Sequence, residues 1–331
     1  MPRKIEISHR TIVFIAIFIF LIWFIVQIKD ILLMLFISII LMSALNPGVD
    51  RLERWGLPRS LAIAIAYIAL WLVLGSVIAG IVPPLVEQTG RLVRLLPTAI
   101  NRVEFFNAHQ QQIGEQLLTR IGSLPENLLK LSLGVFSNFL NVLTTLVITF
   151  YLLLERQHLN KYLAILLAGE SPARASRLVN EIERRLGSWV RGELILMLAV
   201  GVLTYFGLTL LGLDIALPLA ILAGVLEIVP NIGPIVSAVP AVLIGLIIHP
   251  LLGLSTAALY LLVQFMENNF LVPKIMQRAV GVNPLVSILA LMIGFRLAGP
   301  AGAILAIPTI LVVQTIGVEF FSLRHLESLS S

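Results

Sequence analysis

The sequence has no cysteine and little charge. Only 12% of its 331 residues are Asp, Glu, Lys or Arg, about half the charged fraction of an ordinary globular chain. The missing cysteine excludes disulfides, thiolate metal sites and a thiol nucleophile. The few charged side chains cannot cover the surface of a water-soluble fold of this size, whereas a chain embedded in lipid needs few of them. The shortage of charge therefore predicts a membrane protein.

Hydrophobic residues make up 58% of the chain, and its mean hydropathy is +1.00. They gather in long runs, and a transmembrane helix needs roughly 20 apolar residues. The pattern predicts an all-α polytopic membrane protein with about eight spanning helices. The apolar runs occupy residues 12–26, 31–45, 60–82, 131–154, 193–212, 215–229, 233–248, 251–270, 284–298 and 300–321.

The first two runs are separated by little more than Lys29 and Asp30, which predicts a tight helical hairpin. No A-x-A-like cleavage site follows the first run, so we expect it to be an uncleaved span rather than a signal peptide.

Changes in composition divide the chain into four parts. Residues 1–154 contain the N-terminal spans, with a proline-punctuated, extracytoplasmic helical insert at 83–130. Residues 155–192 hold seven Lys or Arg and predict a cytoplasmic amphipathic helix, whose ordinary role is to lie at the membrane interface. Residues 193–321 form a C-terminal unit of broken apolar segments, and residues 322–331 form a tail.

Basic residues indicate the orientation. With the N-terminus inside the cell, the predicted cytoplasmic segments hold 16 Lys and Arg and the outer segments hold 7. Because cytoplasmic loops of membrane proteins are enriched in Lys and Arg, both termini are predicted to be cytoplasmic. The net charge of +5 is explained in the same way and does not indicate a nucleic-acid partner.

The C-terminal unit contains an internal repeat. A Pro-Leu pair stands fifteen residues before a Gly-Pro pair, twice, and the two copies are offset by 66 residues. The copies are Pro218-Leu219 with Gly233-Pro234 and Pro284-Leu285 with Gly299-Pro300. Since glycine permits a turn and proline lacks an amide hydrogen, each Gly-Pro pair predicts the tip of a helical hairpin.

One predicted span, 251–270, lies between the two hairpins, so the hairpins would enter the membrane from opposite sides and the repeat would be inverted. Inverted repeats with Gly- or Pro-broken helices are typical of secondary transporters, whose binding site lies at the repeat interface. The alternative is that the Gly-Pro pairs make short turns between ordinary spans.

Two glutamates fall inside predicted spans, Glu227 and Glu267. A carboxylate in the bilayer core costs about 2.5–3.5 kcal/mol on the insertion scale, so it normally faces a polar interior or a water path. Gln264 and Asn268 lie beside Glu267 in the sequence, and Asn231 follows Glu227. We therefore expect the two glutamates to couple transport and the amides to supply polar ligands. The alternative for Glu267 is simple solvation near the cytoplasmic interface.

Four further charged residues lie at predicted helix ends, where solvation is the expected role. They are Glu193, Asp214, Arg296 and Glu319.

Motifs of common enzymes are absent from the sequence. There is no G-x-x-x-x-G-K-[ST] phosphate loop, no H-E-x-x-H and no G-x-S-x-G, and the five histidines are scattered over predicted loops and termini. We therefore expect no enzymatic activity, no cofactor and no metal site.

Three motifs resemble the AI-2E family of transporters, the autoinducer-2 exporter-like proteins. Residues 226–234, LEIVPNIGP, with Pro240 after them, are similar to the family's E-x-x-P-x-x-G-P core. The second motif is similar to the family's Q-x-x-E-N segment with its following proline and consists of Gln264, Glu267, Asn268 and Pro273. The third is similar to the family's glycine-rich last hairpin and consists of Gly294, Leu297, Gly299, Gly302, Ala306 and Pro308. The resemblance covers nearly the whole chain. Where the family often has a glycine pair, this chain has Gly294-Phe295 followed by Arg296.

The resemblance implies a multi-pass protein of a prokaryotic cytoplasmic membrane. Family members are linked to export of autoinducer-2, and others to exchange of sodium or lithium for protons, so the partner would be a small polar solute or a monovalent cation. The sequence leaves open which of the two is carried, the coupling ion, and whether the chain forms a homo-oligomer. A hypothesis of another class is a membrane scaffold or assembly factor that transports nothing.

Overall fold

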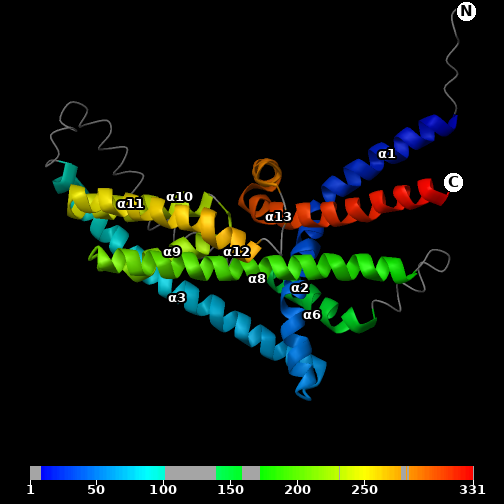
Figure 1. Ribbon diagram of the computed structural model, residues 1–331, viewed down its shortest axis with the longest axis horizontal. Helices are drawn as coiled ribbons and strands as arrows, with labels where there is room; N and C mark the ends of the chain where they lie inside the picture. The colour runs from blue at the N-terminus through cyan, green and yellow to red at the C-terminus, as the bar shows by residue number, and fades with distance from the viewer. Residues whose placement is uncertain are drawn as a thin grey trace, which may run out of the picture.

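A computed structural model of the chain describes residues 9–100, 139–158, 172–230, 232–276, 281 and 283–330, and in this part of the chain it contains helices and no strand. Figure 1 shows the arrangement. The helices are α1 (His9–Gln27), α2 (Lys29–Arg54), α3 (Arg59–Ile100), α6 (Phe139–Glu155), α8 (Pro172–Leu210), α9 (Ala216–Leu226), α10 (Ile232–Ile248), α11 (Pro250–Met266), α12 (Val272–Met276) and α13 (Pro284–Ser330).

Five segments are long and apolar enough to cross a membrane: Lys29–Arg54, Arg59–Gly80, Ala173–Leu210, Pro250–Met276 and Leu285–Glu319. Shorter apolar helices accompany them. The predicted all-α polytopic fold is confirmed.

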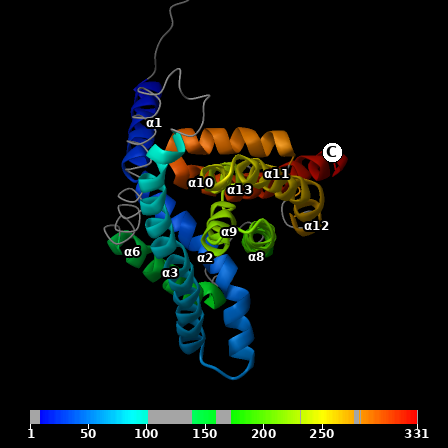
Figure 2. The same cartoon turned by 90° about the vertical axis from the view of Figure 1, so that its left-hand side faces the viewer.

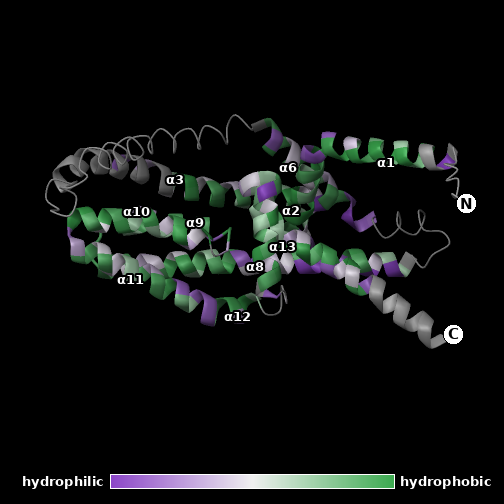
Figure 3. Ribbon diagram, turned by 90° about the horizontal axis from the view of Figure 1, so that it is seen from above, coloured by the Kyte–Doolittle hydropathy of each residue, from purple (hydrophilic) through white to green (hydrophobic). Residues whose placement is uncertain are grey.

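Large apolar side chains cover the outside of the helices. Phe18, Trp71, Leu198 and Leu261 each expose about half or more of their surface, as do many like them. Figure 3 shows this as hydrophobic colouring along most of the ribbon. A water-soluble monomer rarely exposes contiguous apolar surface on this scale. These faces are therefore suited to lipid.

Helices α1 and α2 do not form the tight hairpin that the sequence predicts. The chain bends at Ile28 and continues onward, as Figures 1 and 2 show. The amide of Ile28 donates to Phe24 at 3.1 Å and the amide of Leu32 donates to Ile28 at 3.0 Å, so helical hydrogen bonding runs through the junction. Lys29 and Asp30 are compatible with a helix, and no glycine or proline is present to end it.

The end of α2, the start of α3 and the end of α6 are tied together by Arg59. Its guanidinium donates to Asn46 at 3.0 Å, Asp50 at 3.2 Å and Glu53 at 2.9 Å, all on α2. Its Nε also donates to the backbone oxygen of Leu153 on α6 at 2.8 Å. Because only 11% of the Arg59 side chain is exposed, these contacts fix the base of this three-helix group.

Helices α8, α9, α10 and α11 form two antiparallel pairs, α8 with α9 and α10 with α11. Figure 2 looks nearly along their axes and shows one pair above the other. Glycines let each pair approach closely: Gly201 faces Gly224 between α8 and α9, and a β-carbon on Gly245 of α10 would stand 2.9 Å from the α-carbon of Gly253 on α11. Small residues at helix contacts are typical of packing in lipid.

Helix α13 is folded into two arms. Ala298 (φ −139°, ψ 23°) and Gly299 (φ 59°, ψ −143°) leave the helical region, so the chain turns back at this point. Figure 2 shows the arms running side by side in opposite directions. Gly294 on the first arm contacts Gly302 on the second, too closely for any side chain at either position. The apolar stretch 285–319 is therefore a helical hairpin and not a single straight span.

Two helices run past boundaries that composition suggests. Helix α3 continues through Pro83 and Pro84 to Ile100, beyond the expected end of the third span near residue 82, and the rest of the 83–130 insert lies outside the described residues. Helix α8 joins part of the amphipathic segment 155–192 to the following span without interruption.

Candidate functional site

The first candidate residue lies in a break between α9 and α10. Glu227 caps α9, and the next two amides bond three residues back, from Ile228 to Val225 at 3.3 Å and from Val229 to Leu226 at 3.1 Å. This tightening ends the helix, and Pro230 cannot continue it because it has no amide hydrogen. The break places the Glu227 side chain inside the protein, with 1% of its surface exposed.

The second candidate residue begins a π-helical turn. Residues Glu267–Leu271 form this turn between α11 and α12. Such π-bulges are rare and occur frequently at functional sites. Glu267 is 1% exposed. Its Oε2 accepts a hydrogen bond at 3.4 Å from the side-chain Nε2 of Gln264, one turn earlier in the helix.

The structure brings Glu227 and Glu267 together, although they lie on opposite sides of α10 and α11 in the sequence. Their carboxyl groups lie close enough to interact with each other. Two carboxyl groups can share a hydrogen bond only when a proton lies between them, because an ionised carboxylate has no donor. The Oε2 atom of Glu227 has no partner among the described residues. This buried carboxyl pair is the centre of the candidate site.

A third carboxyl group, which we expected to be solvated, joins this pair. Glu193 on α8 is 3% exposed, and it interacts electrostatically with Glu267 and Glu227. Neither of its oxygens has a hydrogen-bond partner in the described part of the chain. Helix α12 packs next to this position, since Met276 lies against the neighbouring Gly192. Sequence reasoning missed it because it stands at the predicted edge of a span; its spacing from Leu196 and Val200 on one helical face was the available signal.

The carboxyl cluster, Glu193, Glu227 and Glu267, is drawn from three separate parts of the fold. Burying several carboxyl groups together is costly unless protons or cations compensate their charge. Among the residues that the structure describes, no group of three acidic or histidine side chains is arranged to hold a metal ion.

The predicted amide ligands differ in their placement. Gln264 contacts the cluster. Asn268 is exposed, because it directly follows the buried Glu267 and successive side chains of a helix point in different directions. Asn231 lies outside the described residues.

The predicted hairpin tips lie at the two helix breaks. Gly233 and Pro234 fall in the first turn of α10, just after the break, and Gly299 and Pro300 lie at the fold of α13. The first break also contacts the second hairpin, since Val229 packs against the apolar cluster of Leu291, Ala303 and Ala306 on α13. The inverted arrangement of the two hairpins stays a prediction.

Two buried hydroxyl groups lie on the helices that carry the cluster. Tyr260 is seven residues before Glu267 on α11, and Thr204 is eleven residues after Glu193 on α8, so each shares a helical face with its glutamate. Tyr260 is 6% exposed and Thr204 is fully buried, and neither hydroxyl has a hydrogen-bond partner among the described residues. Such groups are uncommon in proteins and suit a site that accommodates water or a polar solute.

Comparison with known proteins agrees with these features. The model of the AI-2E family transporter matches residues 12–320. A Bacillus subtilis (strain 168) protein named "Putative transport protein YrrI" is 29% identical over 312 residues, which cover 90% of this chain and 88% of that protein. The "AI-2 transport protein TqsA" of Escherichia coli (strain K12) is 29% identical over 299 residues, covering 86% of this chain and 83% of TqsA.

The family match spans the carboxyl cluster, both helix breaks and nearly all of the described helices. The chain belongs to the AI-2E family of transporters.

Proposed function

We propose that this protein is a secondary transporter that exports a small polar solute and is driven by protons bound at the carboxyl cluster. The observation that carries this proposal is the buried pair of interacting carboxyl groups of Glu227 and Glu267, with Glu193 beside it. Each of the three comes from a different helix, α8, the end of α9 or the end of α11, so their charge state bears on how these helices pack.

The coupling follows from electrostatics. With its proton, the pair is held by a hydrogen bond. Without it, two negative charges stand in contact in a poorly polarisable interior, where their repulsion far exceeds its value in water. The cluster must then open, take up water, or bind a cation. Val229, two residues after Glu227, packs on α13. An opening of the cluster would therefore change the packing at the second hairpin. Alternation between a protonated closed state and a deprotonated open state would couple proton movement to transport.

The solute is proposed from chemistry and from relatives. Gln264 offers an amide group at the cluster, and Tyr260 and Thr204 add buried hydroxyl groups on the helical faces that carry Glu267 and Glu193. Such groups suit a small neutral hydroxylated solute. A relative is named as an AI-2 transport protein, so autoinducer-2 is the first solute to test. We place the protein in the cytoplasmic membrane of a prokaryote, with both termini in the cytoplasm.

A second candidate function is sodium or lithium exchange for protons. It is favoured by the oxygens of Glu193, which lack partners among the described residues, because hard cations take oxygen ligands. In that case a cation and a proton would alternate at the same carboxyl groups.

Flux into proteoliposomes that contain only the purified protein tests both functions. Uptake of autoinducer-2 driven by a pH gradient supports solute transport, and sodium-dependent dissipation of the gradient without solute supports antiport. The E227Q variant, reconstituted at equal amount, serves as the control for leak. Flux of either kind no greater than in empty liposomes would reject both transport functions and leave the scaffold hypothesis.

A further inference from the structure

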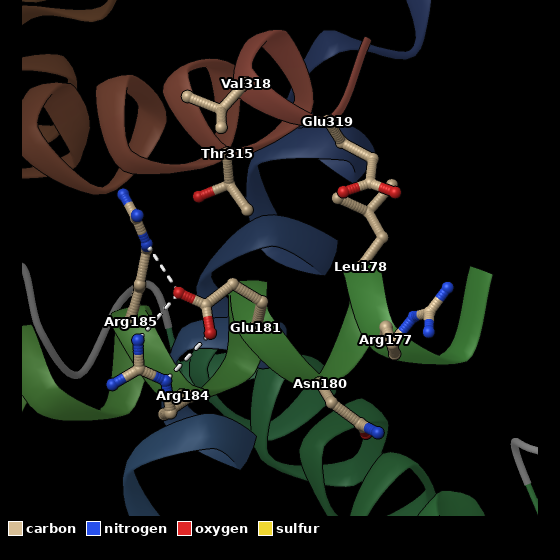
Figure 4. Close-up of a pocket in the computed structure, with 9 residues that line it drawn as sticks. All are labelled: Arg177, Leu178, Asn180, Glu181, Arg184, Arg185, Thr315, Val318 and Glu319. Carbon is tan, nitrogen blue, oxygen red and sulfur yellow. Dashed lines mark hydrogen bonds and ion pairs between the residues drawn. The ribbon is translucent and has the colours of Figure 1, made fainter. Parts of the chain in front are cut away.

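A pocket separate from the carboxyl cluster lies between the N-terminal part of α8 and the second arm of α13. It has a volume of about 480 Å³, and Figure 4 shows the side chains around it. The α8 wall carries three arginines, Arg177, Arg184 and Arg185. These belong to the basic segment that the sequence singled out and that the transport mechanism does not use.

The charges around the pocket do not balance. Glu181 accepts hydrogen bonds from both Arg184, at 2.7 and 2.8 Å, and Arg185, at 2.9 Å. One carboxylate therefore serves two guanidinium groups. Arg177 is exposed, and no described carboxylate pairs with it. The ion pair between Arg174 and Glu319, at 2.9 Å, is neutral. The named residues, four arginines and two glutamates, leave two positive charges uncompensated.

Donor groups remain on these arginines. Arg184 uses Nε and Nη2 on Glu181 and keeps Nη1, while Arg185 uses Nε on Glu181 and Nη1 on Gln314 and keeps Nη2. Planar guanidinium groups with free N–H donors match phosphate oxygens, often in a bidentate fashion.

The pocket lies where the apolar segment of α13 ends, and we expect the membrane surface at this level. Glu319, which lines it, is the last residue of the apolar segment Leu285–Glu319, and Val318 beside it is exposed. Figure 1 shows the second arm of α13 running alongside this part of α8. Basic pockets between helices at a cytoplasmic membrane surface bind the head groups of anionic lipids.

We propose that this pocket binds a phosphate group, supplied by the head group of an anionic phospholipid, through Arg177 and Arg184. The phosphate would accept hydrogen bonds from the free donors of Arg184, and Arg177, on the other side of Glu181 in Figure 4, would add its positive charge. The lipid chains would lie along the exposed apolar face of α13. A bound lipid would hold the amphipathic part of α8 against the second hairpin. This proposal does not depend on the transport function.

The test is lipid binding to the full chain, purified in detergent and stripped of lipid, followed by native mass spectrometry. The lipid-bound fraction is titrated with phosphatidylglycerol and with phosphatidylcholine, which has the same phosphate but no net charge. We expect phosphatidylglycerol to bind more tightly, and R177Q and R184Q each to weaken it about tenfold, or about 1.4 kcal/mol. R177K should retain most of the binding, because the charge remains.

The matched control is R51Q, which removes an exposed arginine on α2 far along the chain from the pocket. Phosphatidylglycerol bound equally by wild type, R177Q and R184Q would overturn the proposal, as would equal affinity for phosphatidylcholine.

Titration with inorganic phosphate shows whether the bound phosphate belongs to a lipid or to a soluble compound. If phosphate alone displaces the lipid at millimolar concentration and loses affinity in R177Q, the site serves a soluble phosphate compound; if it does not displace the lipid, the head group is the ligand.

Discussion

At the residue scale, the carboxyl pair makes a direct prediction for Glu227. We expect Glu227→Gln to lower proton-driven flux at least about tenfold, a change of about 1.4 kcal/mol in the barrier, because the amide keeps the volume but cannot release a proton. The amount of folded protein in the membrane should stay the same. Flux per reconstituted protein and membrane abundance are the two measurements.

Asp214→Asn is the matched control for Glu227. It also removes an acidic group from the C-terminal unit, but Asp214 is exposed in the connection between α8 and α9. Its flux should equal that of the wild type. If Glu227→Gln transported at the wild-type rate, or if the two variants lost flux equally, the role of Glu227 in coupling would be wrong.

A second prediction concerns Glu193. A buried carboxyl without hydrogen-bond partners is a liability for stability, so Glu193→Leu should raise or maintain the thermal unfolding midpoint while lowering flux. A raised unfolding midpoint together with a lowered flux would show that Glu193 serves transport and is not needed for packing. Thermal unfolding of the purified protein and flux in proteoliposomes measure them. A variant that loses both stability and flux would show that Glu193 is needed for the fold instead.

The sequence identified two members of the carboxyl cluster but not the third, for a physical reason. Glu227 and Glu267 stand inside apolar runs, where a charge is conspicuous. Glu193 stands where a basic amphipathic segment becomes a span, and at such a border a carboxylate is ordinarily solvated. Its burial depends on the packing of helices that are distant in the sequence, such as the contact of Met276 on α12 with the neighbouring Gly192, more than eighty positions apart. No local pattern reports such a contact.

At the scale of single elements, the fold of α13 depends on Gly299. Its φ of 59° with ψ of −143° is a conformation that L-residues rarely adopt. We expect Gly299→Ala to destabilise the protein by about 1–3 kcal/mol. Gly317→Ala is the control, because Gly317 lies in the second arm with open space around it. There alanine should be neutral or stabilise the helix by up to about 1 kcal/mol.

Thermal unfolding of the two glycine variants under identical detergent conditions compares these effects. Equal midpoints for Gly299→Ala and Gly317→Ala would mean that the turn at residue 299 tolerates a side chain and that the hairpin is not fixed by its glycine.

The helices of the C-terminal unit followed the sequence pattern more closely than those of the N-terminal part. Apolar runs bounded by Gly and Pro gave the breaks after α9 and within α13 to within a few residues, because those residue types act locally on the backbone. The predicted hairpin of α1 and α2 was wrong, since Lys29 and Asp30 interrupt hydrophobicity without interrupting a helix. A charged pair changes which surface a helix can bury, but it does not end its hydrogen bonding.

At the scale of the whole molecule, the helices differ in whether they are long enough to cross the bilayer core. Helix α9 has 11 residues and α10 has 17, which give rises of about 17 and 26 Å against the roughly 30 Å of a bilayer core. Neither arm crosses the core alone, which fits a hairpin whose break lies within the protein. Non-helical backbone is tolerated at such depth only where protein or water satisfies it. The carboxyl cluster at this break is consistent with that requirement.

The long, continuous helix α8 makes the orientation testable. From Arg177 to its end at Leu210, α8 rises about 50 Å, more than the roughly 40–45 Å of a bilayer with its head groups. Arg177 and Asp214, just beyond the end of α8, should therefore face opposite sides of the membrane. The excess of Lys and Arg near Arg177 predicts that its side is the cytoplasm.

Cysteine labelling tests this orientation. Because the chain has no cysteine, single-cysteine variants carry no background. In intact cells a membrane-impermeant maleimide should label Asp214→Cys, and it should label Arg177→Cys only after permeabilisation. Labelling of Arg177→Cys from outside would reverse the orientation and move the arginine pocket to the outer surface, and labelling of both in intact cells would show that α8 does not span.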